Sequence, residues 1–206
     1  MGLRLRGGAK EVKEPRRRES WALSSRVAGC CGICIRDDST DMRAQPAILA
    51  TCSIYTPDGV FAAHYTIAGL AELDFPGRKE IAETCDSSPH VRHWHKQTCR
   101  AVMRVLQGAA AGELPPLDLA SGTDFQRKVW EALRQIPAGQ TKSYGQLAAD
   151  LGAPKVARAV GSACGANPIP VLIPCHRVLA TGGGLGGFSG GLDWKRKLLA
   201  REAEGR

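Results

Sequence analysis

The sequence predicts two small domains after a disordered leader: an α/β domain with an antiparallel sheet over residues 48–120, and a mainly helical, helix-turn-helix domain over residues 121–206. Three patterns indicate this fold class. Short β-rich segments precede one amphipathic helical segment, two helix-capping signals follow further on, and Pro115-Pro116 makes a stiff connector between the two patterns. A chain of 206 residues is long enough for two such cores.

The leader, residues 1–47, begins with a charged stretch from Arg4 to Arg18 that has no helical or strand period and little to bury, which predicts disorder. Its cysteines include one Cys-x-x-Cys, Cys31 to Cys34. A zinc site of the usual kind needs a second pair at ligand spacing, so we predict no metal site.

The α/β domain is expected from three strand-like segments separated by turn signals at Pro57-Asp58-Gly59 and near Gly69. The segments are Ile48–Tyr55, Val60–Tyr65 and Leu70–Phe75. Apolar residues then recur at helical spacing over residues 90–107 and stop at Gly108. The pattern predicts a meander of antiparallel strands followed by one amphipathic helix.

The second domain is expected to be built from four helices. Capping boxes at Thr123 to Gln126 and Ser143 to Gln146 start the first two, and Pro154 opens a third. The third spans Lys155 to Cys164 and the last spans Leu192 to Ala203. Two short helices joined by a tight glycine-containing turn predict a helix-turn-helix, whose second helix usually enters a DNA groove.

Charge is distributed unevenly along the chain. The formal net charge of +8 divides into +4 for residues 1–47, −2 for residues 48–120 and +6 for residues 121–206. The basic second domain favours a polyanionic partner. Eight cysteines without a signal peptide favour reduced thiols, and no apolar run approaches the roughly 20 residues of a membrane helix, so we expect a cytoplasmic protein.

The chemistry centres on the run from Val171 to Val178. Three branched apolar residues predict a short buried strand that Pro174 ends, so that Cys175 emerges at the strand's end. A thiolate is the reactive form of cysteine, and His176 with Arg177 would provide the electropositive setting that lowers its pKa. Of the eight cysteines, we expect only Cys175 to combine a histidine with such a position; the alternative is a structural cysteine at a buried strand.

The segment from Asn167 to Val178 strongly resembles the active-site segment of the O6-alkylguanine-DNA alkyltransferases, or methylated-DNA–protein-cysteine methyltransferases, and most resembles bacterial members. The resemblance extends from about Thr123 to Glu202. It implies a ribonuclease-H-like first domain and a winged helix-turn-helix-like second domain.

The resemblance also implies the roles of the catalytic residues. Cys175 would be the alkyl acceptor, His176 the base that takes its proton through a water, and Glu202 the carboxylate that orients the histidine. Tyr144 would protonate the leaving guanine. The product thioether is not reopened by water, so each molecule would act once, on O6-alkylguanine or O4-alkylthymine, in direct reversal of DNA damage.

A base inside a duplex must be extruded before such a reaction. The resemblance implies that Arg158 fills the gap left in the stack and that Asn167 fixes the bend before the active-site segment. The candidate residues for contact with DNA or the flipped base are Arg158, Asn167, Val178, Ser189, Gly190 and Arg177. The expected partner is double-stranded DNA. We expect the protein to bind it as a monomer, to need no cofactor and not to associate with a membrane.

A glycine-rich stretch over residues 182–191 would let backbone groups approach the base closely. Within it Phe188 replaces a tyrosine of vertebrate relatives, which leaves the preferred alkyl group open. The presence of Cys175 excludes the alkyltransferase-like proteins, which lack the cysteine. Two other classes stay open: a helix-turn-helix regulator, which would bind undamaged DNA selectively, and a cysteine hydrolase, which would turn over repeatedly.

Overall fold

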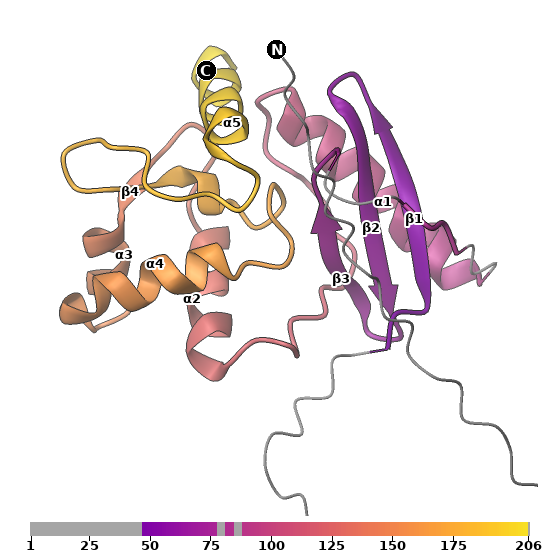
Figure 1. Ribbon diagram of the computed structural model, residues 1–206, viewed down its shortest axis with the longest axis horizontal. Helices are drawn as coiled ribbons and strands as arrows, with labels where there is room; N and C mark the ends of the chain where they lie inside the picture. Colours follow the sequence, from indigo (N-terminus) through magenta and orange to yellow (C-terminus); the bar gives the residue numbers. More distant parts are fainter. Residues whose placement is uncertain (1–46, 78–80, 85–87, 206) are drawn as a thin grey trace, which may run out of the picture. The chain divides into compact units, whose positions relative to one another are not determined.

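The computed structural model describes residues 47–77, 81–84 and 88–205, which all fall in one compact unit (Figure 1). Of the predicted leader only Ala47 is described, and the Cys-x-x-Cys lies outside the described residues. Among the described helices, none combines the length and the apolar character needed to cross a membrane.

A three-stranded antiparallel sheet in the order β1-β2-β3 opens the described chain, which confirms the predicted meander. Its strands are β1 (Ala50–Thr56), β2 (Gly59–Thr66) and β3 (Gly69–Asp74). Gly69 has φ +141°, and a Cβ there would lie 2.1 Å from the carbonyl oxygen of Pro116. Only glycine therefore allows the connector to bond to the start of β3, where Leu70 N donates to the Pro116 carbonyl at 2.8 Å.

The predicted amphipathic helix is α1 (Pro89–Leu106), which packs against all three strands (Figure 1). The side chain of Ser88 caps its first turn, and Pro89 lacks the N–H group that would be left unpaired there. Its buried face carries Val91, Thr98, Ala101, Val102, Val105 and Leu106.

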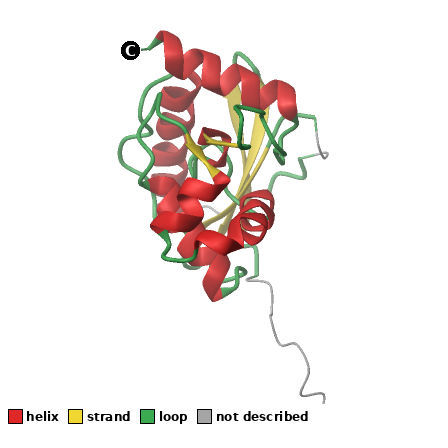
Figure 2. Cartoon of the chain, turned by 90° about the vertical axis from the view of Figure 1, so that its left-hand side faces the viewer, coloured by secondary structure: helices red, strands yellow, loops and turns green. Residues whose placement is uncertain are grey.

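The remainder is mainly helical, as predicted, and lies in front of the sheet in the side view (Figure 2). The helices are α2 (Asp124–Arg134), α3 (Tyr144–Asp150), α4 (Ala157–Gly165) and α5 (Leu192–Glu204), with 3-10 turns η1 (Pro154–Val156) and η2 (Cys175–Arg177). Both predicted capping boxes form. The two-residue strands β4 (Lys142–Ser143) and β5 (Val178–Leu179) pair in parallel.

The predicted strand at Val171–Ile173 is wrong. These residues form turns, with Val171 at φ 75° and Ile173 N donating to the carbonyl of Ile169 at 2.9 Å. The reason lies in Pro168, Pro170 and Pro174, because each proline removes a donor that a sheet would need.

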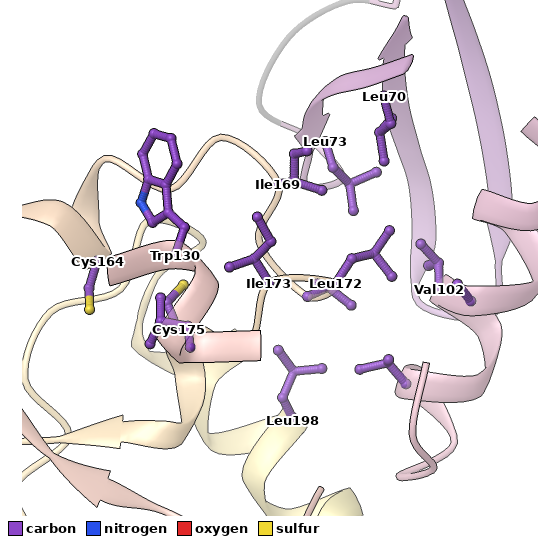
Figure 3. Close-up of a cluster of buried hydrophobic side chains, with 14 of the residues drawn as sticks. Leu70, Leu73, Val102, Trp130, Cys164, Ile169, Leu172, Ile173, Cys175 and Leu198 are labelled. Atoms are coloured by element: carbon purple, nitrogen blue, oxygen red, sulfur yellow. The ribbon is translucent and has the colours of Figure 1, made fainter. Parts of the chain in front are cut away.

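Burial, which made this segment look like a strand, is nevertheless real. Ile169, Leu172 and Ile173 lie between the sheet side chains Leu70 and Leu73 and the helical part (Figure 3). The buried apolar residues of the sheet, α1 and the helical part form one cluster. A domain boundary near residue 120 stays a prediction.

Candidate active site

Cys175 opens the 3-10 turn η2 and is 3% exposed. The side-chain amide of Asn167 donates to its sulfur at 3.2 Å and to the carbonyl of Ile173 at 2.8 Å, while the amide oxygen accepts from Ile169 N at 3.0 Å. One buried asparagine therefore ties the end of α4, the proline-rich turn and the thiol together.

A buried carboxylate, Glu202 on α5, lies at the centre of the ionic contacts next to the thiol. It accepts from His176 Nε2 at 2.9 Å, from Arg177 Nη2 at 2.7 Å and from the backbone of Gly139 at 2.9 Å. Burial alone would raise the pKa of Glu202, but the bonds from His176 and Arg177 outweigh it and lower that pKa from 4.5 to about 2. Glu202 is therefore ionised at neutral pH.

The contact with Glu202 determines the form of His176. Because Nε2 faces a carboxylate, the network assigns the ring proton to Nε2. The buried Nδ1 atom has no hydrogen-bond partner among the described residues. Burial lowers the pKa of His176 below its usual 6.5 despite the opposing effect of Glu202. At neutral pH the ring is uncharged and offers a lone pair at Nδ1, as a general base requires.

The expectation that Arg177 contacts DNA is contradicted. Its side chain is 7% exposed, pairs with Glu202 and donates to the backbone carbonyl of Ile136. A guanidinium that is neutralised by a buried carboxylate is not available to a phosphate.

In this state the burial of Cys175 outweighs the lowering of its pKa that was expected from His176 and Arg177. Burial raises the pKa of Cys175 from 9.0 to about 11, and the groups that oppose this rise include Asn167 and Lys195, not His176 or Arg177. The thiol is therefore protonated at rest and needs a base to lose its proton.

Lys195 on α5 was missed by the sequence analysis. It is fully buried, and its ammonium group donates to the carbonyl of Val178 at 2.6 Å and to that of Gly187 at 3.4 Å. Burial lowers its pKa, and the nearby thiols of Cys175 and Cys164 oppose that shift. Its spacing to Leu198 and Glu202, three and seven residues on, puts it on the inward face of α5, and this periodicity was the available signal.

Tyr144, the first residue of α3, lines a hollow of about 440 Å³ together with Gly161, Gly165, Gly187, Phe188 and Ser189. Burial raises the pKa of Tyr144, and the thiols of Cys164 and Cys175 add to the shift, so the phenol keeps its proton. A Cβ on Gly186, at φ +63°, would lie 2.8 Å from the Tyr144 hydroxyl. The glycine-rich stretch, which is a loop, can approach the tyrosine this closely only because residue 186 is glycine.

The other candidate contacts with DNA lie in different settings. Arg158 is exposed on α4, and Ser189 lines the hollow. Asn167 and Val178 are buried, and one lone pair of the Val178 carbonyl is used by Lys195. Gly190 lies against the ring of Phe75.

A second thiol, Cys99, also has a histidine beside it, but it lies within helix α1 and so lacks the strand-end position that the prediction for Cys175 combined with a histidine. Cys99 on α1 lies 3.4 Å from His95 Nε2, and His95 Nδ1 lies 3.1 Å from the hydroxyl of Tyr65. Burial raises the pKa of Cys99 and lowers that of His95, so both groups are neutral. The described residues contain no group of three or more His, Cys, Asp or Glu side chains arranged to hold a metal ion.

Comparison with known proteins connects this site to a family. Residues 124–204 match the model for the DNA-binding domain of 6-O-methylguanine DNA methyltransferase. A methylated-DNA–protein-cysteine methyltransferase of Methanosarcina acetivorans is 41% identical over 139 residues, which are 65% of this chain and 85% of that protein. The namesake of Mycolicibacterium paratuberculosis is 54% identical over 95 residues, 45% of this chain and 58% of that relative.

Solved structures agree with the sequence relatives. The crystal structure of Mycobacterium tuberculosis OGT in complex with DNA superposes with a TM-score of 0.61 at 37% identity, covering 74% of this chain and 91% of that one. An O6-methylguanine DNA methyltransferase from Methanococcus jannaschii gives 0.57 at 30% identity, covering 74% and 93%. With 41% identity to a relative aligned over most of its length, this chain belongs to the family of methylated-DNA–protein-cysteine methyltransferases.

Proposed function

We propose that this protein repairs alkylated DNA by transferring the alkyl group of O6-alkylguanine, and of O4-alkylthymine, irreversibly to the sulfur of Cys175. The observation that carries the proposal is the neutral His176, held at Nε2 by Glu202 and without a partner at Nδ1, directly after a buried protonated thiol. The raised pKa of Tyr144, caused mainly by burial and to a smaller extent by the thiols of Cys164 and Cys175, supports its role as a proton donor near the thiol.

In this mechanism the thiol proton of Cys175 passes through a water to His176 Nδ1 as the sulfur attacks the alkyl carbon. The S–C bond forms while the bond from carbon to guanine O6 breaks. Tyr144 gives its proton to the departing guanine, which leaves as a neutral base, and recovers a proton from the imidazolium through solvent. Glu202 stabilises the imidazolium that forms in between. In the thioether product the cysteine thiolate is too poor a leaving group for water to displace from the alkyl carbon, so each molecule reacts once.

The proposal includes extrusion of the base from a duplex. The helix-turn-helix would be α3 with α4, within a winged helix-turn-helix-like domain that follows a ribonuclease-H-like one. The exposed Arg158 on α4 would fill the gap in the stack, and Ser189, Gly190 and the remaining lone pair of the Val178 carbonyl would bind the flipped base. A monomeric, cytoplasmic protein without a cofactor stays a prediction.

The function is tested by incubating the protein with a duplex that contains O6-methylguanine labelled on the methyl group. One equivalent of label should move to the protein in a single phase, with no later turnover. Selective binding of undamaged DNA without transfer would favour a transcription regulator. Repeated turnover on esters or amides would favour a cysteine hydrolase.

Changing Tyr144 to Phe should slow alkyl transfer by roughly 10²-fold, because the departing guanine loses its proton donor. Single-turnover rates on the methylated duplex measure this, with DNA affinity and thermal unfolding followed in parallel. The phenol is half-buried beside glycines, so the variant should fold normally. A collapse in thermal stability with an unchanged rate would instead make Tyr144 a packing residue.

Changing Arg158 to Ala should slow repair in a duplex by at least about 10-fold but leave the reaction with free O6-benzylguanine nearly unchanged, because the free base has no stack to leave. Lys155, an exposed cation in η1 three residues earlier, offers a matched control for simple loss of charge. If the Arg158 and Lys155 variants lose duplex activity equally, Arg158 acts only as a charge.

A further inference from the structure

Aromatic side chains connect the sheet to the glycine-rich loop. The ring of Phe75, the residue after β3, lies 5.6 Å from that of Phe188 at 69° and 5.1 Å from that of Trp194 on α5. The ring of Phe188 lies 6.4 Å from that of His176 at 86°. A continuous set of ring contacts therefore runs from Phe75 through Phe188, in the wall of the hollow, to His176, the proposed general base.

The loop backbone also rests on Phe75. A Cβ on Gly190 would lie 2.5 Å from the Phe75 ring, closer than real side-chain contacts. Gly190 is not among the glycines with positive φ, so its backbone conformation does not itself require glycine. The requirement for glycine at this position is therefore spatial, and the Phe75 ring is what occupies the space.

The end of β3, two residues before Phe75, is bonded to a different segment of the chain. Leu73 N, in β3, donates to the carbonyl of Pro168 at 2.9 Å, which attaches this end of the sheet to the segment before Cys175. Within the loop, Gly191 N donates to the Phe188 carbonyl at 3.1 Å, and from α5 Lys195 Nζ donates to the Gly187 carbonyl at 3.4 Å. A segment this rich in glycine loses much conformational freedom when it is ordered, so a rigid neighbour stabilises its position.

We infer that Phe75 is a positioning residue. It holds the loop from Gly186 to Gly190 in place, and with it the wall of the hollow formed by Phe188 and Ser189, so that the flipped base can be bound while the alkyl group is transferred. The inference rests on the proposed function for its effect on rate, but not for its effect on the loop. Because Phe75 directly follows β3, the sheet would then influence the reaction indirectly, through the position of the loop.

The sequence offers a matched control. Phe61 in β2 belongs to the same aromatic group, with its ring 5.6 Å from Phe75 and 5.4 Å from Trp194, but it has no ring contact with Phe188. Both phenylalanines are buried, at 0% and 4% exposure. Phe61→Leu and Phe75→Leu should therefore cost similar stability, while only the second removes the support of the loop.

The experiment measures hydrogen exchange of the peptide that spans residues 182–191 and single-turnover rates with O6-benzylguanine and with the methylated duplex. For Phe75→Leu we expect exchange in the loop to rise, and both rates to fall, by about fivefold, the size of one aromatic contact. For Phe61→Leu, compared at equal folded fraction, loop exchange and rates should stay near those of the wild type. Phe75→Met provides a second version if the leucine variant folds poorly.

Equal changes in the Phe61 and Phe75 variants, or unchanged loop exchange in the Phe75 variants, would overturn the inference. Failure of the wild type to take up an alkyl group would overturn the proposed function instead, and the exchange data would still decide the role of Phe75.

A double-mutant test measures the coupling between Gly190 and Phe75. Gly190→Ala should disturb loop exchange and the transfer rate in the wild type but much less in combination with Phe75→Ala, because the Phe75 ring that the new methyl group would contact is then absent. Equal effects of Gly190→Ala in both backgrounds would contradict the contact.

Discussion

Replacement of Cys175 by Ala should abolish alkyl transfer completely while leaving a folded protein that binds duplex DNA. The sulfur is both nucleophile and final acceptor, so no other group can replace it. The loss of one buried sulfur should cost only about 1 kcal/mol of stability, because the Asn167 amide keeps its bond to the carbonyl of Ile173. Intact mass after reaction, circular dichroism and duplex binding together measure the three properties.

Cys99 provides the control for this prediction, since it also contacts an imidazole, that of His95. Cys99→Ala should still gain one alkyl group per molecule at the wild-type rate. Peptide mapping of the wild type should find the adduct on the peptide that contains Pro174-Cys175-His176. An adduct on Cys99 or Cys164, or sustained turnover, would refute Cys175 as the acceptor.

Replacement of Glu202 by Gln should give the largest combined loss of stability and rate among the variants that keep the thiol. It leaves the buried guanidinium of Arg177 without a counter-charge, which typically costs about 3–5 kcal/mol. It also removes the charge that orients His176 and stabilises its protonated form, so transfer should slow by about 10²-fold. Urea unfolding and single-turnover rates measure the two effects.

Asp58 is the control for loss of a carboxylate that pairs with arginine, because it accepts from Arg201 and Lys197 on α5 but not from His176. Asp58→Asn should lower stability less than Glu202→Gln and leave the transfer rate close to that of the wild type. A rate loss as large in the Asp58 variant would mean that Glu202 acts only through stability.

The pH dependence of unfolding checks the same carboxylate. The pKa of Glu202 is about 2 in the folded protein, against an ordinary value of 4.5. Its ionised form therefore contributes roughly 3 kcal/mol to the free energy of unfolding above pH 4.5, and this contribution disappears as the pH falls toward 2. The stability difference between wild type and Glu202→Gln should therefore narrow over that range. Asp58, whose pKa is also about 2, titrates in both proteins and does not affect the difference.

Much of the fold was predictable because its signals are local. The capping boxes at Thr123 and Ser143 satisfy their own helix ends, and Gly59 and Gly69 allow the turns that pair the strands. The thiol, the adjacent histidine and the carboxylate on the last helix were also identified from the sequence, the last of these through the resemblance to the family.

What failed, or was missed, depends on contacts between distant segments. The run Val171–Ile173 is buried as a strand would be, but the prolines around it leave no ladder to join. Arg177 was expected to contact DNA, but its charge is neutralised by Glu202, which lies 25 residues further along the chain. The pKa of Cys175 rises because the surrounding chain excludes water from the thiol. Lys195 was missed because a lysine in a helix is expected to be exposed, whereas here it is buried.

The sequence by itself therefore determined where the helices and turns begin, which residue carries the nucleophile and which family the chain resembles, because each of these is written in neighbouring residues. Only the tertiary structure decided which charges are neutralised, which groups keep their protons and what supports the glycine-rich loop. Those properties follow from burial and from distances between segments far apart in the chain, as between Phe75 and Phe188.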